Sequence, residues 1–155
     1  MLAYVLCTLA LLGIALLLGA TVYESVVMAP NYERNIPASV QAARQFLKKT
    51  TPAHYFRPLS PIAQVCTLGG LVASWPTATV RWWLLTALVI LVLLDIITFS
   101  FHYPRRATLF KGPMPEDSAL LTRAAREWAQ GNIVRAVLLL VAFLSTLQAV
   151  SLLAR

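Results

Sequence analysis

Four apolar runs separated by basic segments constrain this chain more than any other feature. A bilayer core about 30 Å thick needs about 20 apolar residues per helix, so each run is a candidate membrane crossing. The runs are Leu2–Val22, Leu59–Trp75, Trp82–Phe101 and Ile133–Leu153. We therefore expect an all-α fold, with one transmembrane domain over residues 1–155. Its four-helix transmembrane bundle would have helices at about 2–29, 59–75, 82–102 and 132–153.

The composition favours lipid over water as the surrounding solvent. Hydrophobic residues make up 59% of the chain and charged residues 12%, whereas a typical soluble domain has about 25% charged residues. The net charge of +7 comes from basic residues that lie between the apolar runs and form no single patch. We therefore expect a lipid bilayer as partner and no nucleic acid. Cys7 and Cys66 lie inside apolar runs, without the spacing of a zinc site.

The distribution of Lys and Arg predicts the orientation in the membrane. Ten basic residues lie in the two long links: Arg34, Arg44, Lys48, Lys49, Arg57, Arg105, Arg106, Lys111, Arg123 and Arg126. The opposite side carries only Arg81 and Arg155. The positive-inside rule then places the long links in the cytoplasm and both termini outside, in a bacterial inner membrane. Because no Lys or Arg precedes Tyr23, we expect the first run to be a retained helix, continuing through Glu24 toward a stop at Pro30.

Both long links contain an amphipathic stretch that predicts a short helix. In residues 38–49, Val40, Ala43, Phe46 and Leu47 recur at helical spacing opposite basic and polar side chains. Such a helix lies on the membrane surface or packs on the bundle, and it serves as a lid, a lipid contact or a partner site. In the second link, Asp117 or Ser118 is a candidate cap for a helix over residues 119–130.

Polar side chains within and beside the apolar runs gather on the side of the long links, and polar groups in a membrane are costly and often functional. They are Glu24, Arg57, Asp95, His102, Trp128, Asn132 and Arg135. Asp95 and His102 are seven residues apart and share a helix face if the helix is continuous. Trp128, Asn132 and Arg135 share a face in the same way. We expect a polar pocket at this end of the bundle, with Arg57 and Arg135 available to the carboxylates of Glu24 and Asp95.

The same residues also allow simpler interpretations and other chemistries. Arginines near helix ends also snorkel to headgroups, and Glu24 can be solvated at the interface. Glu24, His54, Asp95 and His102 have side chains that bind metals, but no Glu-x-x-His motif supports a metal site, and we expect none. The chain has no nucleotide-binding glycine motif and no nucleophile elbow, so nucleotide chemistry and serine hydrolysis are not indicated.

Three short motifs resemble the anthrone-oxygenase-like family of small four-helix membrane proteins. They are the segment 23–31 (YESVVMAPN), His102-Tyr103-Pro104, and Trp128-x-x-x-Asn132-x-x-Arg135. Members with an assigned role are similar to cofactor-free oxygenases that convert anthrones to anthraquinones. The resemblance therefore implies an oxygenase-like reaction without a cofactor, with a metal-dependent oxygenase as the alternative, although family membership alone does not establish an activity.

Such a reaction begins with the removal of a proton from an acidic carbon beside a carbonyl. We assign Glu24 or His102 as the base and Arg135 as the group that stabilises the oxyanion. The candidate substrate-binding residues are Asn31, Arg57, Asp95, Trp128 and Asn132. The predicted function is an oxidoreductase that acts on a hydrophobic aromatic or quinone-like small molecule. The alternative is a non-catalytic subunit, in a homo-oligomer or with a membrane protein partner, in which the polar residues pair with one another and leave no cavity.

Overall fold

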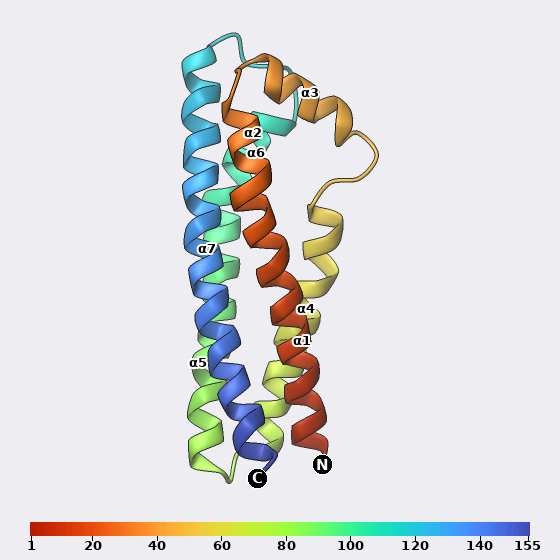
Figure 1. The fold of residues 1–155 in the computed structure, drawn as a ribbon, viewed down its shortest axis with the longest axis vertical. Coiled ribbons are helices and arrows are strands. Elements are labelled where there is room, and N and C mark those ends of the chain that lie inside the picture. The colour runs from red at the N-terminus through yellow and green to blue at the C-terminus, as the bar shows by residue number, and fades with distance from the viewer.

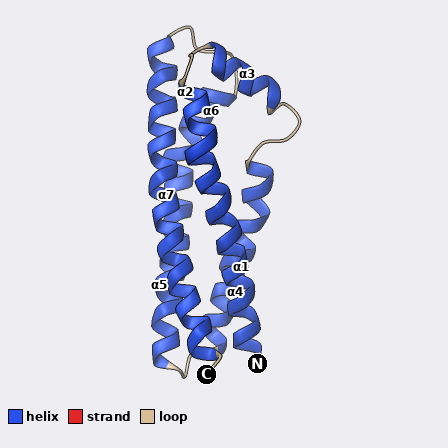
Figure 2. Ribbon diagram, in the orientation of Figure 1, coloured by secondary structure: helices blue, strands red, loops and turns tan.

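The computed structural model describes residues 1–155 as a chain of helices without strands (Figure 2), which confirms the all-α fold. Its elements are α1 (Leu2–Tyr23), the π turn η1 (Glu24–Met28), α2 (Ala29–Glu33), α3 (Ala38–Phe46), α4 (Ala53–Ala73), α5 (Ala78–Ile97), the π turn η2 (Thr98–His102), α6 (Tyr103–Phe110) and α7 (Ser118–Leu153).

The long helices lie side by side, and the short helices gather at one end (Figure 1). Helix α1 packs against α4 and α7, and α5 packs against α7 and α4. Both termini lie at the end opposite α2, α3 and α6 (Figure 1). Three apolar clusters follow one another along the molecule, centred on Leu84 near the termini, Leu91 in the middle and Leu121 beneath the short helices.

Three continuous helices are long and apolar enough to cross a membrane: Leu2–Glu33, Ala78–Phe110 and Ser118–Leu153. Large apolar side chains such as Leu12 and Ile96 face outward along these helices. Since lipid is the solvent that favours this exposure, the chain is an integral membrane protein. Helix α4 is not among the three, because Arg57, Ser60 and Gln64 interrupt the apolar residues of its first half.

The helices extend beyond the predicted ranges. Helix α4 begins at Ala53, where a start at about residue 59 was expected, and α7 runs unbroken from Ser118 through Gly131, where a start at about residue 132 was expected. The first helical segment continues past Pro30 to Glu33, and the third continues past His102 to Phe110. The apolar runs marked only the parts that face lipid, whereas the helices continue into the polar end of the molecule.

A π turn precedes Pro30 in the first long helix and Pro104 in the third. The turn η1 ends two residues before Pro30, and η2 ends two residues before Pro104. In a regular α-helix the proline ring clashes with the carbonyl four residues earlier and has no N–H to donate to it. A π turn widens the helix at this point, which explains why Pro30 does not stop the first helix as predicted.

Helix α3 packs on the end of the bundle, which decides between the two placements left open by the sequence. Val40 and Ala43 are buried in one cluster with Leu109 and Leu121. Arg44 fastens the helix by donating to the backbone carbonyls of Leu109 (2.6 Å), Gly112 (2.9 Å) and Thr108 (3.1 Å). Phe46 is 81% exposed, so the apolar face of α3 is buried only in part.

Candidate functional site

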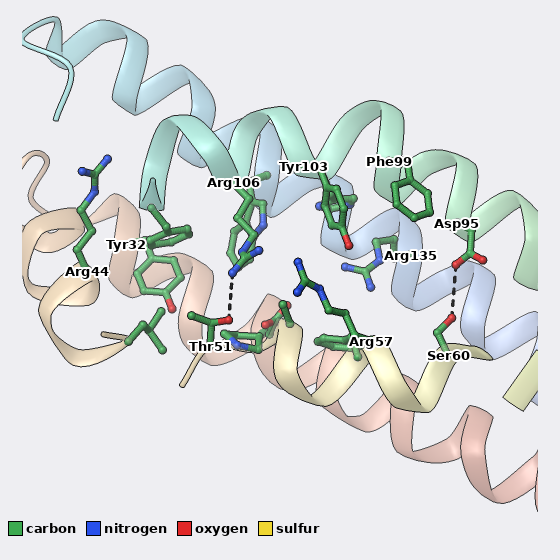
Figure 3. Close-up of a pocket in the computed structure, with 18 of the residues that line it drawn as sticks. Tyr32, Arg44, Thr51, Arg57, Ser60, Asp95, Phe99, Tyr103, Arg106 and Arg135 are labelled. Carbon is green, nitrogen blue, oxygen red and sulfur yellow. Dashed lines mark hydrogen bonds between the residues drawn. The ribbon is translucent and has the colours of Figure 1, made fainter. Parts of the chain in front are cut away.

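A cavity of about 360 Å³ lies at the end of the molecule that carries the short helices. Its volume falls within the range of about 300–1,000 Å³ that is typical of small-molecule sites. Figure 3 shows most of the side chains around it. The lining residues are Glu24, Tyr32, Arg44, Leu47, Thr51, Pro52, Ala53, Phe56, Arg57, Ser60, Pro61, Asp95, Phe99, His102, Tyr103, Arg106, Phe110, Trp128 and Arg135.

The cavity lies between the first half of α4 and the continuous helix formed by α5, η2 and α6, and polar contacts join these two walls at both ends. Toward the termini, Asp95 accepts hydrogen bonds from Gln64 Nε2 (2.6 Å) and Ser60 Oγ (3.4 Å), the latter drawn in Figure 3. Toward the short helices, Arg106 Nη2 donates to Thr51 Oγ1 (3.0 Å; Figure 3). These contacts hold the walls together and leave the space between them open to a ligand.

Each π turn contributes a buried polar side chain to the cavity. Glu24 is the first residue of η1 and is 7% exposed, and His102 is the last residue of η2 and is 3% exposed. Both ion pairs of the chain belong to Glu127, so Glu24 has none. Neither ring nitrogen of His102 has a hydrogen-bond partner. Buried polar groups are nearly always hydrogen-bonded in proteins, so the unpaired carboxylate of Glu24 is suited to a ligand or to water in the cavity.

Helix α7 supplies an arginine to the cavity. Arg135 Nη1 donates to Asn132 Oδ1 at 3.3 Å, and Arg135 Nε has no partner. The guanidinium carbon lies 5.2 Å from the ring centroid of Phe56 on α4, a cation–π distance. Asn132 is fully buried behind the cavity wall. Trp128, Asn132 and Arg135 therefore share one face of α7, as expected. Asn132, however, holds Arg135 and does not itself line the cavity.

Three aromatic rings form a wall beside these polar groups. The ring centroids of Tyr32 and Phe110 are 5.3 Å apart, those of Tyr32 and Trp128 5.6 Å, and those of Phe110 and Trp128 6.3 Å. Tyr32 and Trp128 are both buried. Aromatic faces of this kind favour flat, apolar ligands.

The structure brings most of the predicted site residues together. Those that line the cavity are Glu24, Arg57, Asp95, His102, Trp128 and Arg135. Asn31 does not belong to it, since its exposed side chain donates to the carbonyl of Val27 at 2.7 Å. The expected arginine partner of Asp95 is also absent, because Gln64 and Ser60 hold this carboxylate.

The four side chains considered for a metal site do not form one. His54 is exposed on the first turn of α4, where its ring contacts Thr51. No group of three or more His, Cys, Asp or Glu side chains in the chain could hold a metal ion. The alternative built from Glu24, His54, Asp95 and His102 therefore lacks the geometry that it requires.

Several lining residues were not identified from the sequence. Tyr32, Phe56 and Tyr103 are ordinary aromatic residues by pattern, and Arg106 was counted only for its charge. A signal was present for the contact of α4 with Asp95: Ser60 and Gln64 are four residues apart and so share one helix face.

Fold and site define an all-α integral membrane protein with a polar cavity at one end. The sequence model of the anthrone oxygenase family matches residues 50–145. The chain belongs to this family, as its motifs suggested. The matched segment contains Asp95, His102, Trp128 and Arg135, whereas Glu24 precedes it. No curated protein and no solved structure matches the chain.

Proposed function

We propose that the chain is an oxygenase-like membrane enzyme that binds an apolar aromatic or quinone-like molecule in the cavity. The observation that carries this proposal is that Glu24, His102 and Arg135 line one cavity without pairing with one another. Family membership supports the same chemistry. A non-catalytic subunit would need no unpaired acid, imidazole and guanidinium around a shared space.

The proposed reaction starts with the removal of a proton from an acidic methylene group beside an aromatic ketone. Glu24 or His102 takes the proton, and the guanidinium of Arg135 stabilises the oxyanion that results. The electron-rich anion then reacts with O2. Conversion of the methylene group to a carbonyl consumes one O2 and releases one water, so the overall equation balances without a further reductant.

Other lining residues take supporting roles in this proposal. The rings of Tyr32, Phe110 and Trp128 bind the flat substrate, and Asn132 positions Arg135 through their hydrogen bond. The structural alternative applies to Asp95 alone among these residues, because its carboxylate already accepts hydrogen bonds from Gln64 and Ser60. We assign it to joining α4 and α5.

The proposed membrane arrangement has four crossings, with α4 as the fourth. Helix α4 has 21 residues, and at 1.5 Å per residue its length of about 31 Å matches the bilayer core. The basic links would lie in the cytoplasm of a bacterial cell and the termini outside the inner membrane. Impermeant thiol labelling in a cysteine-free background tests this: Thr77→Cys should react in intact spheroplasts and Lys49→Cys only after lysis.

The activity is tested with purified protein and anthrone, by following O2 uptake and anthraquinone formation against a protein-free blank. Glu24→Gln, His102→Gln and Arg135→Gln should each lower the rate at least tenfold if the residue has its assigned role. Matched controls are Glu33→Gln, His54→Gln and Arg126→Gln, which remove the same groups from exposed positions outside the cavity. Equal rates for the cavity variants and their controls would contradict the proposal.

A further inference from the structure

The cavity has more positive than negative charge around it. Four arginines line it, Arg44, Arg57, Arg106 and Arg135, against the two carboxylates of Glu24 and Asp95. None of these six groups takes part in an ion pair, because both ion pairs of the chain involve Glu127. With every group in its usual ionised form, two positive charges remain without a counter-charge.

Three of the arginines have hydrogen-bond donors to spare. Arg44 is occupied by three backbone carbonyls, whereas Arg106 makes a single hydrogen bond, to Thr51. No hydrogen bond or ion pair within the chain holds Arg57, and Arg135 makes one long hydrogen bond, at 3.3 Å. Figure 3 shows Arg57 and Arg135 reaching into the cavity from α4 and α7, which are different helices.

The proposed reaction does not remove this excess charge. Proton transfer from a neutral substrate to Glu24 neutralises one carboxylate and creates one oxyanion, so the total charge of the cavity is the same before and after. Transfer to His102 creates one cation and one anion, with the same result. A neutral substrate would therefore leave two guanidinium charges at the cavity wall without a counter-charge.

We propose that the cavity takes an amphiphilic anion, in which an apolar body carries a permanent carboxylate or phosphate group held by Arg57 and Arg135. The planar guanidinium fork matches both acidic groups. Arg57 lies at the exposed edge of α4, and Phe99, which faces the same space from η2, is 64% exposed. The acidic group thus binds near the opening, while the apolar body lies along the aromatic residues. The inference rests on the proposed function only in taking this cavity as the ligand site.

The test compares two fluorescent probes of one shape, anthracene-2-carboxylate and the uncharged anthracene-2-carboxamide, on the full-length protein in detergent. The carboxylate should bind at least tenfold more tightly, and Arg57→Gln should remove most of that preference. Unchanged affinity of Arg57→Gln for the carboxamide would show that the cavity is intact. Arg34→Gln, which removes an exposed arginine outside the cavity, should bind both probes like the wild type.

Competition with lipids identifies the source of the acidic group. Displacement of the carboxylate by phosphatidylglycerol but not by phosphatidylcholine, with the same dependence on Arg57, supports a lipid headgroup as ligand. Resistance to both lipids supports a free carboxylate amphiphile. Equal affinity for the two anthracene probes, or a preference that survives Arg57→Gln, overturns the inference. The binding test involves no turnover. A negative result would therefore overturn this inference without contradicting the proposed function, which the anthrone assay tests separately.

Discussion

His102 lies directly against Gly131, so that a Cβ atom at position 131 would be 2.8 Å from Cε1 and 2.9 Å from Nε2 of the imidazole. Phe101 Cε1 would be 2.7 Å away. Real Cβ atoms do not approach other atoms this closely, so only glycine at this position of α7 lets η2 pack with its imidazole in place. The helix face that carries Trp128 and Arg135 thereby also sets the position of the candidate base.

Gly131→Ala should therefore displace His102 and weaken the packing of η2 on α7. Overpacking of this kind costs about 1–3 kcal/mol, more than the gain of up to about 1 kcal/mol in helix propensity. We expect a lower unfolding temperature by circular dichroism in detergent and a reduced rate with anthrone. Gly19→Ala is the control, since nothing lies within 4 Å of a Cβ there. Equal stability of the two variants would show that the imidazole moves aside freely.

The adjacent glycines of α4 should respond differently to the same substitution. A Cβ at Gly70 would be 2.7 Å from Sγ of Cys7, which is fully buried on α1, whereas a Cβ at Gly69 would meet a terminal methyl of Leu6 at 3.2 Å. A leucine methyl can rotate away, but Cys7 has no space to do so. Gly70→Ala should lower the unfolding temperature clearly more than Gly69→Ala. The reverse order would mean that α1 and α4 are not packed as described.

The contact between Gln64 and Asp95 should contribute measurably to stability. Gln64→Met keeps the volume but leaves the carboxylate with only the 3.4 Å bond from Ser60, at a cost of about 1–3 kcal/mol in the free energy of unfolding. Ser60→Ala should cost less because its bond is long. The double variant Gln64→Met/Asp95→Leu should recover part of the loss, because no partly buried carboxylate is then left without a close partner. Additive losses in this double variant would contradict the pairing.

Arg44 should fasten α3 to α6 through geometry as well as charge. Arg44→Lys keeps the positive charge near the carbonyls of Thr108 and Leu109 at the end of α6 and of Gly112 beyond it, but a lysine cannot donate to all three at once. We expect faster hydrogen exchange at the amides of residues 38–46 and little change in α5 or α7. Arg34→Lys, an exposed arginine outside this contact, serves as the control. Identical exchange in the two variants would assign the stability of α3 to Val40 and Ala43 alone.

Much of the architecture could be predicted because the membrane imposes strong rules on a sequence. Long apolar runs predicted the three helices that are apolar enough to span, and the family was identified from short motifs near the cavity. The polar residues on one side predicted that a pocket forms there. Their gathering follows from elementary energetics, since such groups are costly in lipid and collect where they can be satisfied.

The details that escaped prediction depend on helix geometry and on distant contacts. The extension past Pro30 was missed because apolar periodicity assumes a regular α-helix, in which proline is a stop. The partner of Asp95 was missed because charge complementarity pointed to arginine, whereas α4 presents Gln64 to it. Asn31 was assigned to the site because it belongs to one of the family motifs. Its side chain instead donates to the carbonyl of Val27 in the same helix.

The two π turns also determine how the helical segments that follow them are rotated about the helix axis. A π turn holds about one residue more than an α turn, and one residue corresponds to about 100° of helix rotation. Without the extra residue in η1, the segment that carries Tyr32 would be rotated by about that angle relative to α1. The same holds for the segment that carries Arg106 beyond η2. Single-residue deletions in these turns would thus redirect whole groups of cavity residues while leaving composition and hydropathy almost unchanged.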